Sequence, residues 1–188
     1  MPAARRPAPR SRHLALLRGV NVGGKGIVSM AALADTFRGL GFDDVRTYIN
    51  SGNVIFSAAP ISQSTLTNRI ERAIERDTGL PVTVLVIDDA ALRSIVAAIP
   101  STWVTDATLR TDVLFLWPDV DEPAVLDRIP RNLEVDDVRY TPGALIWRID
   151  RANASRSRET KLVGSALYKR MTIRNANTTR KLHELLSG

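Results

Sequence analysis

The segment from Arg18 to Gly26 has a composition suited to binding an anion, because it holds four glycines flanked by two cations. A glycine-rich loop that leaves a strand and enters a helix turns backbone N–H groups toward a ligand, and the helix N-terminus favours negative charge. Glycines that only permit tight turns explain the same pattern without a ligand. The candidate ligand-binding residues of this first motif are Arg18, Asn21, Gly23, Gly24 and Lys25.

The spacing from Gly19 to Lys25 imitates the phosphate loop G-x-x-x-x-G-K of nucleoside triphosphatases. The next position is Gly26, where that loop needs the hydroxyl residue that holds Mg²⁺. The helix expected after the loop also begins at about Met30, too late to place Lys25 in its first turn. We therefore set a triphosphatase function aside.

A second polar motif runs from Thr47 to Asn53. Its sequence Asn-Ser-Gly-Asn is typical of a hairpin turn, which explains the motif without a ligand. The functional interpretation is that Tyr48, Ser51 and Asn53 offer hydrogen-bonding groups to a ligand. In the topology argued below, we expect this turn and the glycine loop to lie at opposite ends of the sheet, out of contact within one unit.

The third motif, from Thr172 to Lys181, places Arg174 at the end of an expected strand and just before an expected helix. An arginine there is suited to bind a carboxylate or phosphate with two parallel hydrogen bonds. Asn175 and Asn177 complete the candidate site, although capping of the helix accounts for either asparagine.

Three segments, LLRGVNVGGKG, TYINSGNVIF and MTIRNANTTRKL, resemble the signature segments of the bacterial family known as domain of unknown function 1697. The resemblance spans residues 13–187 and implies an architecture of two ferredoxin-like units, but no activity. In the third segment the family typically has an aromatic residue between the two asparagines, whereas this chain has Ala176. If that aromatic residue contacts a ligand in the family, this chain has a different ligand preference. The arginine-rich N-terminus lies outside the family pattern.

The first half of the chain carries the elements that must position these motifs. Apolar runs predict strands, and apolar residues at helical spacing predict helices with serine caps and glycine stops. The order is β-α-β-β-α-β, that of a ferredoxin-like unit. The strands are expected at 13–18, 45–49, 54–56 and 82–87, and the helices at 30–40 and 62–77.

The second half nearly repeats this order after a helix at 89–99. The strands are expected at 113–117, 135–140, 144–149 and 171–174, and the helices at 122–129, 161–168 and 178–186. The predicted fold class is therefore α/β (α+β), with two consecutive ferredoxin-like units and an added C-terminal helix. The predicted parts are a disordered basic tail at 1–12, a first unit at 13–88, a connecting helix and linker at 89–112, and a second unit with its terminal helix at 113–188.

Composition narrows the class of protein. Hydrophobic residues make up 44% of the sequence, the balance of a globular protein with a core. The sequence has no cysteine, which excludes disulfides, thiolate metal sites and a cysteine nucleophile. No apolar run reaches the roughly 18 residues that cross a bilayer, and the N-terminal arginines precede no apolar signal core. We expect a cytoplasmic protein without membrane segments, and we predict no metal site.

The distribution of charge raises nucleic acid as an alternative partner. The net charge is +6, with +7 in residues 151–188, +4 in residues 1–12 and −5 in the remainder. A ferredoxin-like sheet with a basic segment favours RNA binding, but only Phe56 offers an aromatic ring on the central strands of the first unit. The first hypothesis is therefore a small anionic, phosphate- or nucleotide-type ligand, and nucleic-acid binding is the alternative. The sequence leaves the oligomeric state open.

An enzyme acting on an anionic metabolite is the third hypothesis, with Tyr48 or Lys25 transferring a proton. The sequence holds only two histidines, His13 and His183, and neither has an expected partner. It has no H-E-x-x-H or G-x-S-x-G motif and no clustered metal ligands. We identify no catalytic residues and no cofactor, and we lean against an enzyme.

Overall fold

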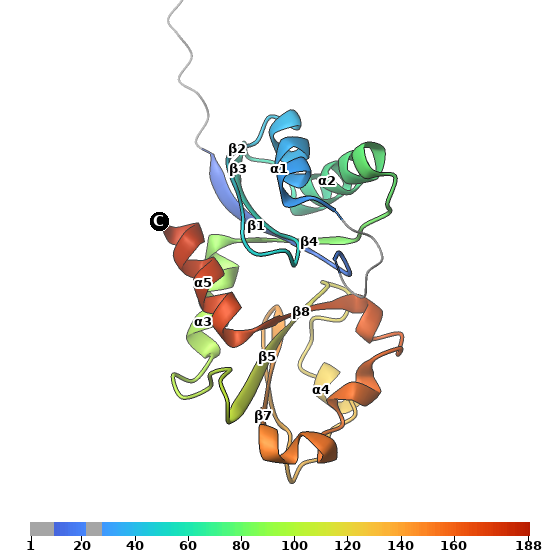
Figure 1. The fold of residues 1–188 in the computed structure, drawn as a ribbon, viewed down its shortest axis with the longest axis vertical. Coiled ribbons are helices and arrows are strands. Elements are labelled where there is room, and N and C mark those ends of the chain that lie inside the picture. The colour runs from blue at the N-terminus through green and yellow to red at the C-terminus, as the bar shows by residue number, and fades with distance from the viewer. Residues whose placement is uncertain (1–9, 22–27) are drawn as a thin grey trace, which may run out of the picture. The chain divides into compact units, whose positions relative to one another are not determined.

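The computed structural model describes residues 10–21 and 28–188. These form a mixed α+β protein with two four-stranded antiparallel sheets (Figure 1). The chain divides into two compact units, one ending at Asp89 and the other beginning at Ala90. No helix within the described ranges is long and apolar enough to cross a membrane.

The first unit follows the predicted order β-α-β-β-α-β. Its strands lie in the spatial order β2-β3-β1-β4, and each neighbouring pair is antiparallel. β1 begins at Ser11, inside the segment predicted as a disordered tail, and the rest of that segment up to residue 9 lies outside the described residues. The elements are β1 (Ser11–Leu17), α1 (Met30–Gly39), β2 (Asp43–Thr47), β3 (Asn53–Ala58), α2 (Gln63–Thr78) and β4 (Val84–Asp88).

The two helices of this unit begin and end where their capping residues predict. Ser29 caps α1 by accepting a hydrogen bond from the Ala32 amide, and Ser62 caps α2 by accepting one from the Thr65 amide. Gly79 ends α2 in the left-handed conformation at φ 71°. These residues explain why both helices were predictable to within a few positions.

Both helices pack their apolar faces on one face of the sheet. Phe37 of α1 meets Phe56 of β3 edge-on with ring centroids 5.3 Å apart, and Ile70 of α2 belongs to the same fully buried cluster. Each large side chain buried in this way stabilises the fold by about 1.5–3 kcal/mol. The strand residues on this face alternate with their neighbours and include Ala15, Leu17, Val54, Phe56, Val84 and Val86.

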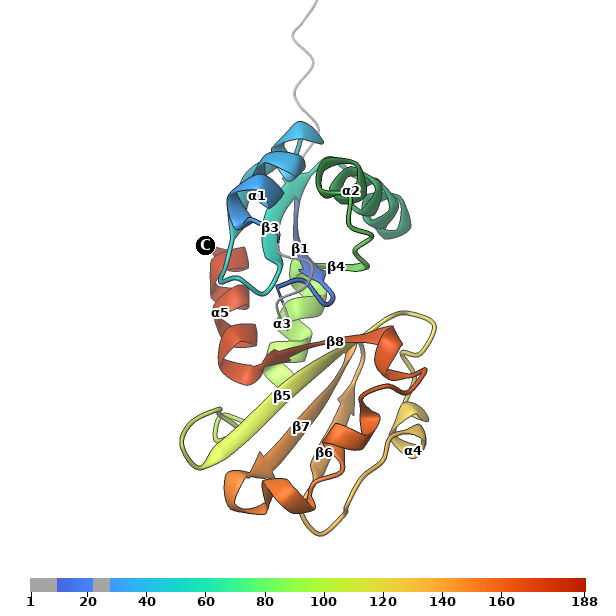
Figure 2. The same ribbon diagram turned by 45° about the vertical axis from the view of Figure 1, so that its right-hand side comes forward.

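The second unit contains an antiparallel sheet in the order β6-β7-β5-β8 (Figure 2). α4 and the segment from 151 to 170 cover the face with Leu114, Leu145 and Trp147, and α5 packs against β5 and β8. Its elements are α3 (Asp89–Ala98), β5 (Leu109–Leu116), α4 (Val125–Arg128), β6 (Asp137–Thr141), β7 (Ala144–Asp150), β8 (Met171–Asn175) and α5 (Ala176–Ser187).

The helix predicted over 161–168 is wrong. Residues 151–170 instead contain three short 3-10 turns, η1 (Arg151–Arg156), η2 (Glu159–Leu162) and η3 (Tyr168–Arg170). Gly164 lies at φ 89°, which a continuing α-helix does not allow. Leu162 and Leu167 are both buried in the core, although residues five apart do not share one face of an α-helix, so the turns between them are what bury both.

Candidate functional site

The first two sequence motifs meet at one end of the first sheet. The Leu17 amide donates to the Gly52 carbonyl at 2.8 Å, and the Asn21 side-chain amide donates to the Asn50 carbonyl at 2.9 Å. The expectation that these motifs lie at opposite ends is therefore wrong. β3 runs antiparallel to β1 with Asn53 opposite Leu16, so the end of β1 and the start of β3 share an edge.

Asn21 is a structural residue of this end. Its backbone is left-handed at φ 56°, and its side-chain oxygen accepts from the Val28 amide at 2.8 Å. Its side-chain nitrogen donates to the Val28 carbonyl at 3.1 Å and to the Asn50 carbonyl. Both amide hydrogens are thus used within the chain, so Asn21 holds Val28 and Asn50 in place. Gly23, Gly24 and Lys25 lie outside the described residues.

Asn53 is structural as well. It is fully buried, and its side-chain nitrogen donates to the Tyr48 carbonyl at 3.0 Å, while the Tyr48 amide donates to the Asn53 carbonyl at 3.0 Å. These bonds hold Ile49 in a left-handed conformation at φ 49° with 46% of it exposed. That conformation is a genuine outlier for a β-branched residue. The polar candidates that reach the surface here are half-buried Arg18, half-buried Tyr48 and exposed Ser51.

Arg174 lies on β8 and is 8% exposed. Its Nη1 donates to the Thr172 hydroxyl at 3.0 Å and to the Ile173 carbonyl at 2.7 Å. Burial lowers the pKa of the guanidinium to about 10. The cause is desolvation, because burial disfavours the charged form of the side chain.

The two asparagines of the third motif hold the chain around Arg174. Asn175 caps α5 by accepting from the Thr178 amide at 2.8 Å. The Asn177 side chain donates to the Thr105 carbonyl at 2.7 Å and accepts from the Thr105 amide at 3.3 Å. Both side chains thus have structural partners, and Arg174 is the charged candidate of this motif, next to the start of a 12-residue helix.

The predicted residues therefore form two groups in different units. Arg18, Asn21, Tyr48, Ser51 and Asn53 gather at one end of the first sheet, and Arg174, Asn175 and Asn177 gather where β8 meets α5.

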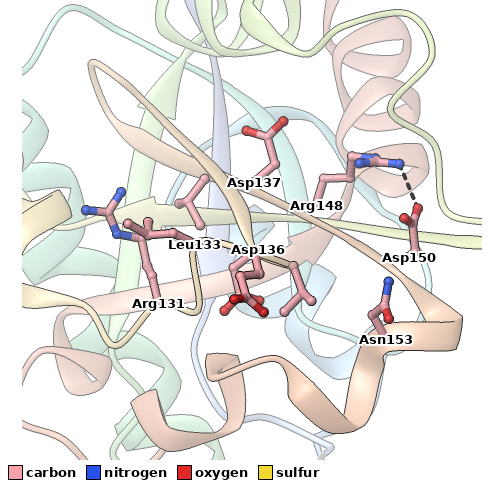
Figure 3. A pocket seen from close by; sticks show the side chains of 10 residues that line it. Arg131, Leu133, Asp136, Asp137, Arg148, Asp150 and Asn153 are labelled. Carbon is pink, nitrogen blue, oxygen red and sulfur yellow. Dashed lines mark hydrogen bonds and ion pairs between the residues drawn. The ribbon is translucent and has the colours of Figure 1, made fainter.

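Sequence reasoning missed a cavity of about 400 Å³ in the second unit (Figure 3). It lies where the chain before β6 meets the end of β7. Its residues belong to no motif, because they come together only when Asp137 of β6 pairs opposite Arg148 of β7. Its lining includes Arg131, Leu133, Asp136, Asp137, Arg148 and Asn153.

Asp136 fixes the wall of this cavity. Its carboxylate accepts from the Trp147 indole at 3.1 Å, the Asn132 amide at 2.7 Å and the Arg158 amide at 3.1 Å. Burial alone would raise the pKa of Asp136, but the hydrogen bonds outweigh it and lower that pKa. Within the described part of the chain, no group of three or more His, Cys, Asp or Glu side chains could hold a metal ion.

The fold and these sites define a protein of two antiparallel-sheet units with buried and half-buried arginines beside polar turns. The chain belongs to the family described as "Protein of unknown function (DUF1697)", whose model matches residues 10–147. The resemblance predicted from the sequence segments is thus confirmed, although the third segment lies beyond the matched residues.

A solved structure, the conserved bacterial protein SP0830 from Streptococcus pneumoniae, is similar over 95% of this chain and 99% of that chain. The TM-score is 0.80 and the sequence identity is 26%. No curated protein matches the sequence. These comparisons carry no activity to this chain.

Proposed function

We propose that this protein binds a small anionic ligand of phosphate or nucleotide type, with the Arg174 guanidinium as its anchoring cation. The observation that carries the proposal is the burial of Arg174, which is 8% exposed and has a pKa lowered to about 10. An anion placed against the guanidinium would form charge-assisted hydrogen bonds, which strengthen away from water.

The local contacts of Arg174 suit this role. Thr172 and the Ile173 carbonyl accept hydrogen bonds from Nη1, and these two neutral groups orient the guanidinium. The N-terminus of α5, which follows directly, adds a favourable dipole for an anion. Asn175 and Asn177 support the site by fixing the start of that helix.

The residues of the first unit enter the proposal as a second polar surface. Arg18, Tyr48 and Ser51 supply its polar groups, whereas Asn21 and Asn53 hold its shape. Gly23, Gly24 and Lys25 stay predicted ligand contacts on the strength of the sequence pattern.

We also propose that the first unit is ferredoxin-like. The element order β-α-β-β-α-β and the antiparallel strand order β2-β3-β1-β4 support this assignment. The second unit has the matching strand order β6-β7-β5-β8, with 3-10 turns where the second helix of that pattern would stand.

Nucleic-acid binding through the basic C-terminal segment loses support, because much of its charge is engaged. Arg156 pairs with Glu134 at 2.5 Å, Arg170 with Asp119 at 2.6 Å and Lys181 with Glu184 at 2.8 Å. Arg180 donates to two backbone carbonyls, those of Pro100 and Trp103. A nucleic-acid partner therefore enters as an outcome of the test.

The test is calorimetric titration of the full chain with inorganic phosphate, a mononucleotide and a short single-stranded RNA at two salt concentrations. We expect phosphate or the mononucleotide to bind the native protein, and Arg174→Gln to weaken binding about tenfold or more. Lys161→Gln is the control, because Lys161 is exposed in the same segment. Binding of RNA alone, lost at high salt, would support the alternative partner. Equal affinity of the native and Arg174→Gln proteins contradicts the proposal.

A further inference from the structure

The cavity beside β6 has hydrogen-bonding capacity that the chain does not use. Arg131 and Asn153 are both half-buried in its lining, and within the described residues neither side chain makes a hydrogen bond or an ion pair. Figure 3 shows them on opposite sides of the cavity. A guanidinium carries five N–H donors and no acceptor, so what Arg131 offers is donor capacity for an anion.

The acidic groups of the lining are already engaged. Glu134 pairs with Arg156 at 2.5 Å, Asp150 with Arg148 at 2.7 Å and Asp137 with Arg139 at 3.4 Å. The carboxylate of Asp136 accepts hydrogen bonds from two backbone amides and one indole. A cationic ligand would therefore share carboxylates that already have an arginine partner, whereas an anionic group at Arg131 meets a guanidinium that has none within the described residues.

The balance of charge limits the anion that fits. The lining holds the two cations Arg131 and Arg148 and four carboxylates, those of Glu134, Asp136, Asp137 and Asp150. A doubly charged phosphate would meet this excess of negative charge, and like charges repel at such distances. A ligand with a single negative charge matches this lining better. Its charge would face Arg131, the lining guanidinium that has no carboxylate partner in the described part of the chain.

The rim of the cavity is apolar next to Arg131. Leu133 is 80% exposed and lies beside Arg131 in Figure 3. Half-buried Val135 and Val138 also line the cavity. A ligand that covers an exposed apolar side chain gains binding free energy, because it removes apolar surface from water. The volume of about 400 Å³ lies in the range of small-molecule sites.

We propose that this cavity binds a small monocarboxylate with an apolar body, its carboxylate on Arg131 and its apolar part on Leu133. Asn153, on the far side, is available to a hydroxyl or carbonyl group of the ligand. This site is separate from Arg174 in residues and in ligand class, so it stands or falls independently of the proposed function.

The test is an NMR titration of the ¹⁵N-labelled full chain with 4-methylpentanoate, which has one carboxylate and a branched apolar body. We expect the amides of residues 131–138 and 148–153 to shift. Arg131→Gln should weaken binding about tenfold or more, the loss expected for a hydrogen-bonded charge. Leu133→Ser should weaken it less, since it removes only apolar contact.

The matched control is Arg128→Gln, because Arg128 is exposed and lies 3.6 Å from Glu122, outside the cavity lining. A thermal melt of each variant confirms that it folds. Three results would overturn the proposal: no shift in these amides, equal binding of the amine 4-methylpentylamine, or equal binding of inorganic phosphate at these residues. Unchanged affinity in Arg131→Gln would overturn it as well.

Discussion

Asn21 bonds both backbone groups of Val28, accepting from its amide at 2.8 Å and donating to its carbonyl at 3.1 Å. One side chain thus ties Asn21, which follows β1, to Val28, which precedes α1. The same side chain donates to the Asn50 carbonyl, which ties it to the β2–β3 turn. The shape of this end of the first sheet therefore depends on a single amide.

Asn21→Ala should lower the free energy of unfolding by about 2–3 kcal/mol, because each lost hydrogen bond contributes about 1 kcal/mol. Urea unfolding followed by circular dichroism measures this change. Asn21→Gly is the control, since it keeps the left-handed backbone at low cost and removes only the side-chain bonds. If Asn21→Ala were as stable as the native protein, the side-chain bonds of Asn21 to Val28 and Asn50 would not stabilise this end of the sheet.

Gly52 is the glycine that this end of the sheet requires. It lies at φ 69°, and a Cβ there would overlap the Val20 side chain and lie 2.7 Å from the Leu17 Cβ. Gly52→Ala should therefore lower the free energy of unfolding, measured with urea, by more than the roughly 1 kcal/mol of a left-handed alanine alone. Gly79→Ala is the matched control, with φ 71° and open space around its Cβ position. Equal losses in the two variants would rule out the steric explanation.

The fold of the first unit could be predicted because its local signals agree. Runs of apolar residues mark β3 and β4, Ser29 and Ser62 cap the helices, and Gly79 ends α2. The structure of segment 161–168 could not be predicted, because Leu162 and Leu167 reach the core through 3-10 turns and not along one face of a helix. Only tertiary contacts, such as the Arg158 amide on the Asp136 carboxylate, show that this part of the chain turns.

The candidate sites were predictable only in part, for a related reason. Arg174 was found because an arginine between a strand and a helix is a local signal. The partners of Asn21 and Asn53 were not, because Val28, Asn50 and Tyr48 offer only backbone groups that sequence does not mark. Arg131 and Asn153 belong to no motif, and only the register of β6 and β7 brings their segments together.

Protonation of His13 should make the first unit less stable in mild acid. It stacks on Phe56 with ring centroids 5.4 Å apart, and burial lowers its pKa below 6.5, although Asp88 opposite it raises that pKa in part. The unfolded chain then binds the proton more readily, so stability falls as the pH drops from about 6.5 toward the lower native pKa. Urea unfolding between pH 7 and pH 5 measures the slope.

His13→Gln should flatten this slope, since glutamine does not titrate. The carboxyl groups with lowered pKa, such as those of Asp106 and Asp136, lose their contribution only below their ordinary value of 3.8, so the two windows are separate. An unchanged slope in His13→Gln would assign the effect to another group.

Asp136 should be the carboxylate on which the second unit depends most. Asp136→Asn replaces an acceptor of several donors, Trp147 and two backbone amides among them, by a group with one fewer acceptor oxygen. We expect a loss of about 2–3 kcal/mol, because hydrogen bonds to a charged group are worth more than neutral ones. Asp127→Asn on exposed α4 is the control and should change stability little. Near-ultraviolet circular dichroism would report the altered Trp147 environment, and an unchanged spectrum and stability would contradict this role.

Substitution of Arg174 distinguishes a ligand-binding role of this residue from a structural one, because the two roles predict opposite effects on the stability of the fold. Burial lowers the pKa of the Arg174 guanidinium to about 10, so the folded chain holds this proton more weakly than the unfolded chain does. At neutral pH the buried charge therefore destabilises the fold. Arg174→Met keeps an unbranched apolar stem and removes the charge. It should leave the urea midpoint unchanged or raise it, while abolishing the stabilisation that phosphate or a mononucleotide gives the native protein.

A structural ion pair at Arg174 would behave in the reverse way, since removing one partner of a buried pair costs about 3–5 kcal/mol. Arg174→Lys completes the comparison, because it retains the charge but loses the planar fork, and its ligand affinity should fall between those of the native and methionine proteins.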